Sequence, residues 1–514
     1  MSLTPADPAA RIDPTFTALP FRRMAEAALN RARDFGVAHA DFRFERVRYQ
    51  DFSVRDGVLE GAEDSQDLGF AVRVLHEGAW GFASGVVLSR DSAITVAEQA
   101  VRVAQVAARM TRIPIELAPE PVYSEAAWCS AYDVNPLEVP LAEKVDAFRH
   151  WTSRLVAAPE VSHASGFLQQ VQENKFYADL TGTTTTQQRV RLQPGLEVHG
   201  TDAASGTFDS MASIAPPAGR GWEYVAGPDA WDFDDEVKRL PGLLAEKLAA
   251  PSVEPGTWDL VVDPSNLWLT IHESIGHATE LDRALGYEAN YAGTSFATLD
   301  RLGTLQYGSP VMHVTGDRTT EHGLATIGYD DEGVATQAWD IVRDGVLVGY
   351  QLDRPMAANY GAELNGGRSN GCAYADSPGH IPIQRMANVS LQPDPDGPST
   401  DGLIADVERG IYVVGDRSWS IDMQRYNFQF TGQRFYRIEN GRLAGQLRDV
   451  AYQATTTDFW GSMEAVGGPQ TYVLGGAFNC GKAQPGQVAA VSHGCPSALF
   501  RGVRILNTAE EGTA

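Results

Sequence analysis

An alternation of apolar and polar residues runs through the first part of the chain. The stretch "ADFRFERVRYQDFSVRDGVLEGAEDSQDLGFAVRVLHEGAWGFASG", residues 40–85, follows this pattern and is interrupted at Asp56-Gly57 and at Glu77-Gly78. A period of two is typical of strands with one buried face, and such glycine-containing pairs mark tight hairpin turns. The segment therefore predicts an antiparallel meander.

Other segments repeat their apolar residues at helical spacing. Helices are expected at residues 21–36, 89–110, 141–157 and 233–249. The strand "WDLVVDP", residues 258–264, then leads directly into a further helix, and from residue 310 onward the pattern is mostly strands and turns. Hairpins are expected at Arg343-Asp344-Gly345 and at Glu439-Asn440-Gly441, where an Asp-Gly or Asn-Gly pair favours a tight turn.

This succession predicts an α+β fold in three parts. A chain of 514 residues suggests two or three domains at about 150 residues each. We expect a mixed N-terminal region of two packed parts, residues 1–112 and 113–226, with the meander and most of the helices. A β-rich C-terminal domain, residues 227–514, would carry the helix after "WDLVVDP". The Pro- and Gly-rich stretch at residues 215–231 marks the boundary.

Composition and charge narrow the range of partners and compartments. Lysine and arginine number 41 against 66 acidic residues, which gives a net charge of −25 and argues against binding a nucleic-acid backbone or an anionic membrane. The first residues lack the apolar core of a signal peptide, and no apolar run of about 18 residues is long enough to span a membrane. Four cysteines are too few for a disulfide framework. We therefore expect a reduced, cytoplasmic protein.

The helix after "WDLVVDP" carries the sequence "IHESIGHATELD", residues 271–282. It approaches the pattern H-E-x-x-H, in which two histidines bind zinc and the glutamate is the general base. Here His272 and His277 are five residues apart, so a regular helix would separate them by about 140°. Two ordinary helix histidines are one interpretation. The other is a π turn near Gly276, which would bring both rings onto one face.

A third ligand is available far downstream. Cys480 lies in the glycine-flanked stretch "YVLGGAFNCGKAQPGQ", and a thiolate is a strong zinc ligand. A small buried side chain is the alternative role for this cysteine. If all three bind one ion at ~2.0–2.3 Å, their ligand atoms must lie within roughly 4 Å of one another.

Together these residues resemble the TldD/PmbA family of metallopeptidases, specifically its TldD-type, metal-bearing subunit. The likeness covers nearly the whole chain. It is carried by "SVRDGVLEG", "GFAVRVLHEGAWGFAS", "HESIGH", "GYDDEGVATQ", "VLVGYQLDR", "PIQRMANV" and "FNCGK". The spacing "HExxxH", followed some 200 residues later by "CGK", is specific to the metal-bearing subunit.

The resemblance implies one zinc ion per chain, bound by His272, His277 and Cys480, with Glu273 as the catalytic base. It also implies a peptidase that acts on extended or unfolded peptides, in degradation or in the maturation of small peptides. Such a chain would work as a homodimer or as a heterodimer with a PmbA/TldE-like subunit. A non-catalytic, peptide-binding subunit of such a heterodimer is the alternative function.

Several further polar residues could have either a structural or a functional role. The acidic triplet at residues 330–332 is expected to form a hairpin turn with solvated charges, or else an element beside the substrate groove. Arg385 is the candidate substrate-contacting cation, with a surface or interstrand arginine as the alternative. His493 and Cys495 could bind a metal, and we expect them to be structural.

Overall fold

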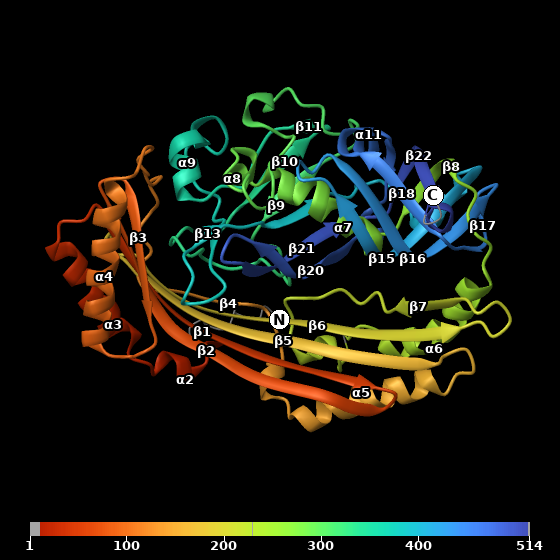
Figure 1. Ribbon diagram of the computed structural model, residues 1–514, viewed down its shortest axis with the longest axis horizontal. Helices are drawn as coiled ribbons and strands as arrows, with labels where there is room; N and C mark the ends of the chain where they lie inside the picture. Colours follow the sequence, from red (N-terminus) through yellow and green to blue (C-terminus); the bar gives the residue numbers. More distant parts are fainter. Residues whose placement is uncertain (1–10, 229, 512–514) are drawn as a thin grey trace, which may run out of the picture.

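The protein has the expected α+β fold, in two layers that face each other. The computed structural model describes residues 11–228 and 230–511. A long, strongly curved N-terminal sheet forms one layer and a β-rich C-terminal part lies over one of its faces (Figure 1). Among the described residues, no helix is both long and apolar enough to cross a bilayer.

The N-terminal sheet contains the predicted meander. Its strands are β1 His39–Arg55, β2 Val58–His76, β3 Ala79–Gly85, β4 Ala126–Cys129, β5 His163–Asp179, β6 Thr184–Thr201 and β7 Phe208–Ala212. They are arranged in the order β3-β2-β1-β5-β6-β4, with β7 also paired to β6 and with β4 parallel to β6. At the first hairpin Asp56 and Gly57 have φ of 50° and 79°, as a tight turn with two left-handed residues requires.

The period-two pattern gives the sheet two different faces. On β1, Phe42 and Phe44 point into an apolar core shared with the helices, whereas Arg43 and Glu45, which alternate with them, are buried on the opposite face. The helices are α2 Pro14–Thr17, α3 Phe21–Asp34, α4 Arg90–Ala108, α5 Leu141–Val156 and α6 Phe233–Ala249. The last four match the helices expected from the sequence. The polar face is left to meet the C-terminal part (Figure 1).

The C-terminal part is built around a closed ring of strands. The ring consists of β8 Gly256–Val262, β15 Arg409–Ile421, β16 Asn427–Glu439, β18 Val450–Thr455 and β22 Ala498–Asn507. The strand β8 pairs with β15 and β22, β22 with β18, β18 with β16, and β16 closes the ring on β15. The helix α7 Pro264–Ile271 follows β8 directly, as the sequence predicted.

Smaller elements complete this part. Further strands are β9 Val314–Asp317, β10 Ala338–Arg343, β11 Val346–Leu347, β12 Ala373–Tyr374, β13 Ile383–Gln384, β14 Asn388–Leu391, β17 Arg442–Leu447, β19 Met463–Val466, β20 Val473–Lys482 and β21 Gln487–Cys495. Short helices are α8 Leu281–Ala284, α9 Arg354–Tyr360, α10 Thr400–Ala405, α11 Thr456–Gly461 and α12 Thr508–Glu511. The expected turns at residues 343–345 and 439–441 connect β10 to β11 and β16 to β17.

Buried ion pairs join the two layers, and they correct one expectation. Asp331 and Glu332 are not solvated turn residues, because each is only 3% exposed. The carboxylate of Asp331 lies 2.7 Å from Lys175 Nζ on β5, and that of Glu332 lies 2.9 Å from Arg73 Nη1 on β2. The cations that make burial possible come from strands about 150 to 260 residues earlier in the chain, so no local pattern indicates them.

The proposed division into three parts stays a prediction. The structure places the strands of residues 39–85 and of residues 126–212 in one continuous sheet. The first two expected parts therefore share their hydrogen-bonded framework.

Candidate metal centre

The helix α7 begins at the edge of the ring and runs into the interior. Asp263 follows β8 and caps the helix, because its carboxylate accepts a hydrogen bond from Ser265 N at 3.0 Å. Pro264 occupies the first helical position, where no N–H is needed. The cap thus fixes where the helix starts, and the next two turns carry the histidines into the protein.

The helix is not regular between the two histidines. Residues His272–Gly276 form a π turn, in which the N–H of His277 donates to the carbonyl of His272, five residues earlier. Of the two interpretations that the spacing left open, the structure therefore has the π turn. Its irregular carbonyls have side-chain donors: Tyr307 Oη donates to Ser274 O, and Gln351 Nε2 donates to Gly276 O at 2.7 Å. The surrounding core therefore stabilises a turn that is rare in helices.

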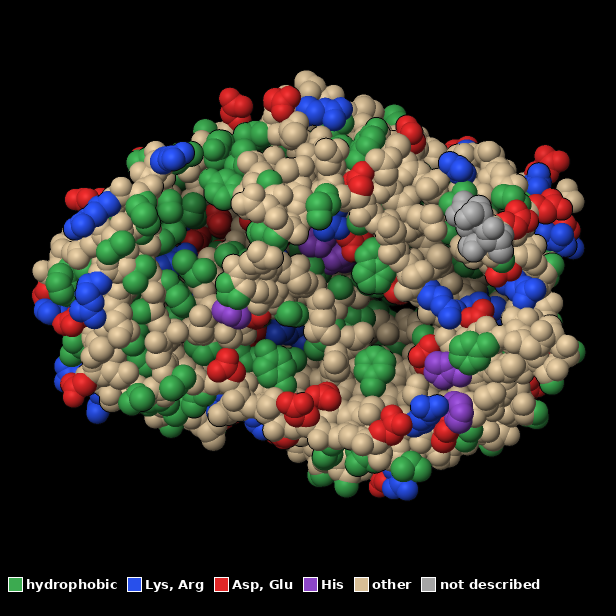
Figure 2. Space-filling model, viewed as in Figure 1, with side chains coloured by type: hydrophobic (Ala, Val, Ile, Leu, Met, Phe, Trp, Pro, Cys, Tyr) green, Lys and Arg blue, Asp and Glu red, His purple; other side chains and the backbone are tan. Residues whose placement is uncertain are grey.

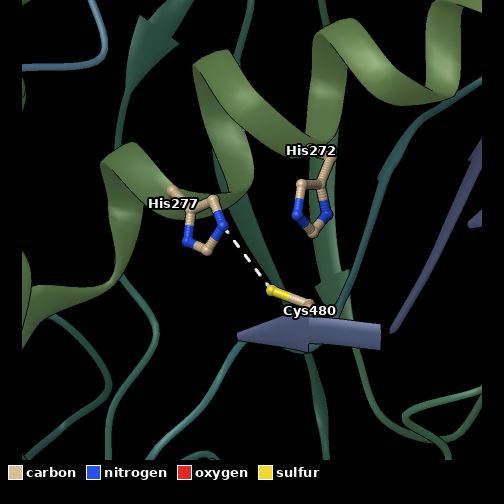
Figure 3. A group of neighbouring side chains, drawn as sticks. All are labelled: His272, His277 and Cys480. Carbon is tan, nitrogen blue, oxygen red and sulfur yellow. Dashed lines mark hydrogen bonds between the residues drawn. The ribbon is translucent and has the colours of Figure 1, made fainter. Parts of the chain in front are cut away.

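The π turn brings three possible ligands together. The side chains of His272 and His277 point down from the helix toward Cys480, which rises from β20 below them (Figure 3). One ligand atom of each residue lies within 4.8 Å of the other two, a looser spacing than the roughly 4 Å expected. His277 Nε2 and Cys480 Sγ are 3.6 Å apart, the distance of two ligands on one tetrahedral zinc ion.

Hydrogen bonds fix the tautomer of His272. His493 Nδ1 lies 2.8 Å from the carbonyl of Val389, which can only accept, so this nitrogen carries the proton. A neutral His493 then has a lone pair on Nε2, which lies 2.7 Å from His272 Nδ1. His272 must donate from Nδ1, and its Nε2 lone pair remains available for a metal. The expectation that His493 is structural is thereby made more specific: it orients a candidate ligand.

A carboxylate fixes the tautomer of His277 in the same way. His277 Nδ1 lies 2.8 Å from Glu280 Oε2, so it donates its proton there and leaves Nε2 free toward Cys480. Glu280 is in turn 3.1 Å from Lys482 Nζ, on the strand that carries Cys480. Lys482 also binds Asp282 and Glu288, at 2.8 and 3.1 Å. The second half of the helix and the cysteine strand are therefore held together by buried charges.

Burial keeps the candidate ligands neutral. It lowers the pKa of His272 and that of His277 well below the ordinary value, and nearby positive charges act in the same direction. Burial also raises the pKa of Cys480 to about 11. Neutral imidazoles are ready to bind a metal, while the thiol must give up its proton as it binds.

Cys480 is supported from below by Arg385. The Arg385 guanidinium donates to the carbonyls of Cys480, at 2.6 Å, and of Gln487, at 3.1 Å. It is only 1% exposed. Substrate contact by Arg385 stays a prediction, and in this structure the side chain ties together the two strands β20 and β21.

Glu273 lies beside the candidate ligands without being one of them. Its carboxylate forms an ion pair with Arg425, which lies in the turn between β15 and β16. Burial raises the pKa of Glu273, and Arg425 opposes the shift. A carboxylate with a raised pKa is better suited to accept and return a proton near neutral pH.

A cleft of about 530 Å³ opens above this group. One wall comes from the N-terminal sheet and the segment after β7, with Phe167, Gly195 and residues 212–217. The other wall comes from α7, β15 and β20. Figure 2 shows the surface hollowed between the two layers. His272, Glu273, His277 and Cys480 all line the cleft, so a ligand that enters it reaches the candidate metal centre.

The three candidate ligands and Glu273 could be identified from the sequence, but several residues that hold them in place were not identified there. Glu280 follows His277 by three residues and Lys482 follows Cys480 by two, so a search for second partners at helix and strand spacing could have found both. Arg425 lies about 150 residues from Glu273 and carries no local signal. Cys495 lies apart from the ligand group, 3.6 Å from the carbonyl of Pro264.

Comparison with known proteins agrees with this arrangement. The family model described as the PmbA/TldA metallopeptidase C-terminal domain matches residues 255–507, which include the whole candidate centre. The model described as PmbA/TldA metallopeptidase domain 1 matches residues 40–104, the meander and the helix after it. Together the two matches span more than half of the chain.

Individual relatives extend along most of the sequence. A metalloprotease of Methanocaldococcus jannaschii is 25% identical over 443 residues, covering 83% of this chain and 89% of its own. A zinc metalloprotease TldD homolog of Saccharolobus solfataricus is 20% identical over 489 residues, covering 93% and 98%. The crystal structure of TldE from Thermococcus kodakarensis shares the fold, with a TM-score of 0.68 at 16% identity over 94% of this chain and 99% of that one. The chain belongs to the PmbA/TldD family of metallopeptidases.

Proposed function

We propose that this protein is a zinc-dependent peptidase of extended or unfolded peptides. One zinc ion per chain would be held by His272, His277 and Cys480, with Glu273 as general base. The observation that carries the proposal is the hydrogen bonding of the two histidines. Each donates from Nδ1, so both Nε2 lone pairs are free beside a buried thiol. Nitrogen and sulfur donors of this kind suit zinc.

Three protein ligands leave room for a water or a substrate oxygen, as in catalytic zinc sites. Bound zinc would polarise the scissile carbonyl and lower the pKa of a water molecule. Glu273 follows the first ligand and lines the cleft, where it can accept a proton from the attacking water and return it to the leaving amine. The ion pair with Arg425 holds this carboxylate in place.

The cleft favours an extended chain as substrate. The strand β20 pairs only with β21, so its other edge has no strand partner among the described residues. Residues 475–481 of β20 line the cleft. A peptide lying there could add to this edge by main-chain hydrogen bonds, which accept many sequences. A dimer with a copy of itself or with a TldE-like chain is part of the same proposal.

The test compares the wild-type protein with Glu273→Ala. We expect one zinc ion per chain in both proteins by elemental analysis, and loss of peptide hydrolysis by ~10²–10⁴-fold in the variant, because a base and not a ligand has been removed. Wild type should cleave an unfolded protein and spare the same protein when folded. Retained activity or lost zinc in Glu273→Ala would refute the assignment, and a zinc-free wild type would support the non-catalytic subunit instead.

A further inference from the structure

The charges that line the cleft are unevenly matched. Beyond the candidate ligands and Glu273, the lining contains two charged side chains, Asp416 and Arg425. Arg425 is paired with Glu273. Asp416 forms no ion pair with any lysine, arginine or histidine in residues 11–228 or 230–511. The cleft therefore presents an uncompensated carboxylate to whatever binds there.

The carboxylate of Asp416 is held in place by neutral groups. Its Oδ1 accepts a hydrogen bond from Trp268 Nε1 at 3.2 Å, and its backbone carbonyl accepts one from Gln433 Nε2 at 2.8 Å. The basic residue next to it, Arg417, turns away and pairs with Asp209 at 2.6 Å. Burial raises the pKa of Asp416, and the hydrogen bond from Trp268 opposes the shift. A partly buried carboxylate without a cation is costly for the protein alone.

Trp268 places this carboxylate close to the candidate metal centre. The indole is stacked on His493 at a centroid distance of 6.4 Å, and its centroid lies 6.4 Å from that of His272. Asp416 is thus one indole ring away from the first candidate ligand. At ~3.3 Å per residue, an extended peptide would span the distance from Asp416 to His272 in about three residues.

We propose that Asp416 is a specificity residue that binds a cationic nitrogen of the peptide substrate, close to the scissile bond. This inference rests on the proposed peptidase function. The cation can be the side chain of a lysine or arginine, or the free amino terminus of the peptide. Either source would supply the missing partner to the carboxylate. The net charge of −25 also favours a cationic substrate, since it attracts cationic peptides to the surface.

The experiment uses fluorogenic peptides in matched pairs that differ in one charge. One pair has lysine or norleucine near the cleavage site, a second has arginine or citrulline, and a third has a free or an acetylated amino terminus. For wild type we expect kcat/KM to be about 10- to 100-fold higher for the cationic member of at least one pair, which is the worth of one charge-assisted hydrogen bond. The pair that discriminates identifies the source of the cation.

Asp416→Asn should abolish this preference, mainly through KM of the cationic peptide. Glu254→Gln is the control, because it removes the same charge from a side chain that is 87% exposed and absent from the cleft lining. It should keep the wild-type ratio. A wild type without any charge preference would overturn the inference even if Asp416→Asn fails to fold. So would an Asp416→Asn protein that loses the same factor on both members of a pair, since that is the effect of a merely structural residue.

A binding measurement separates this inference from the proposed function. Fluorescence anisotropy of the same labelled pairs is recorded on the full-length Glu273→Ala protein, with and without Asp416→Asn. Preferential binding of the cationic member that depends on Asp416 would support the inference even if the wild type cleaves nothing. Equal binding of both members by Glu273→Ala, in a protein whose wild type is an active peptidase, would overturn the inference and leave the peptidase assignment standing.

Discussion

Replacing His493 with phenylalanine should weaken zinc binding although His493 is not among the three proposed ligands. The side chain is fully buried and accepts the Nδ1 proton of His272 at 2.7 Å. Phenylalanine fills similar space but cannot accept a hydrogen bond. In the variant the proton of His272 is free to move to Nε2, the atom that would bind the metal.

Two costs determine how much zinc affinity and how much stability His493→Phe should lose. Loss of a partner that orients a metal-binding histidine typically weakens metal affinity by about 10- to 100-fold. A buried donor left without an acceptor also costs about 1–3 kcal/mol, which lowers the stability of the folded protein with or without zinc. His493→Gln should recover part of the affinity, because an amide can accept from His272 and donate to the carbonyl of Val389, as His493 does at 2.8 Å.

Two measurements distinguish these costs. The zinc dissociation constant is obtained by competition with a chromophoric chelator, and thermal unfolding of the metal-free proteins reports folded stability alone. His163→Phe is a suitable control, since that side chain is 51% exposed and lies on the N-terminal sheet. If His493→Phe unfolds at a lower temperature but binds zinc as tightly as the wild type, His493 is a core residue and the argument from tautomers is wrong.

Two more substitutions test the remaining contacts of the centre. Cys480→Ser should lower zinc occupancy sharply, because a hydroxyl is a far poorer ligand than a thiolate. Cys129→Ser should leave the occupancy unchanged. If Cys495→Ser lowers it more than Cys480→Ser does, Cys480 is not the ligand. Lys482→Met should weaken zinc about 10-fold in the same competition titration, because Glu280 would lose its cation 3.1 Å away and hold His277 less firmly. Unchanged affinity would show that Lys482 serves stability alone.

The part of the site that could be predicted from sequence is the part encoded locally. A spacing of five positions from His272 to His277 permits only two arrangements on a helix, diverging rings or a π turn, and the structure has the π turn. The meander could also be predicted, because its alternation of apolar and polar residues and its hairpin glycines are local signals. Cys480 could be assigned only through the family resemblance, since its distance from the helix in sequence contains no geometric information.

The parts that could not be predicted depend on partners distant in the chain. Asp331 and Glu332 have the composition of a solvated turn, and only the cations Lys175 and Arg73 on other strands make their burial tolerable. Arg425 was missed for the same reason. A charged residue in a sequence is most often exposed, so buried ion pairs formed over long range give no pattern that distinguishes them from surface charges.

These buried pairs also bear on how a substrate is selected. The cleft lies between two layers that are joined by Lys175–Asp331 and Arg73–Glu332, all almost fully buried. Moving the layers apart would break both pairs and would also expose the small apolar cluster that the two layers share, so wide separation is disfavoured. The substrate must then fit the cleft nearly as it stands. A volume of about 530 Å³ is that of a small-ligand pocket. A folded domain of 100 residues, with a radius of gyration of about 13 Å, is far too large to enter it. The proposed selection for unfolded chains would therefore need no recognition of sequence, because only an extended segment could enter far enough to reach Glu273.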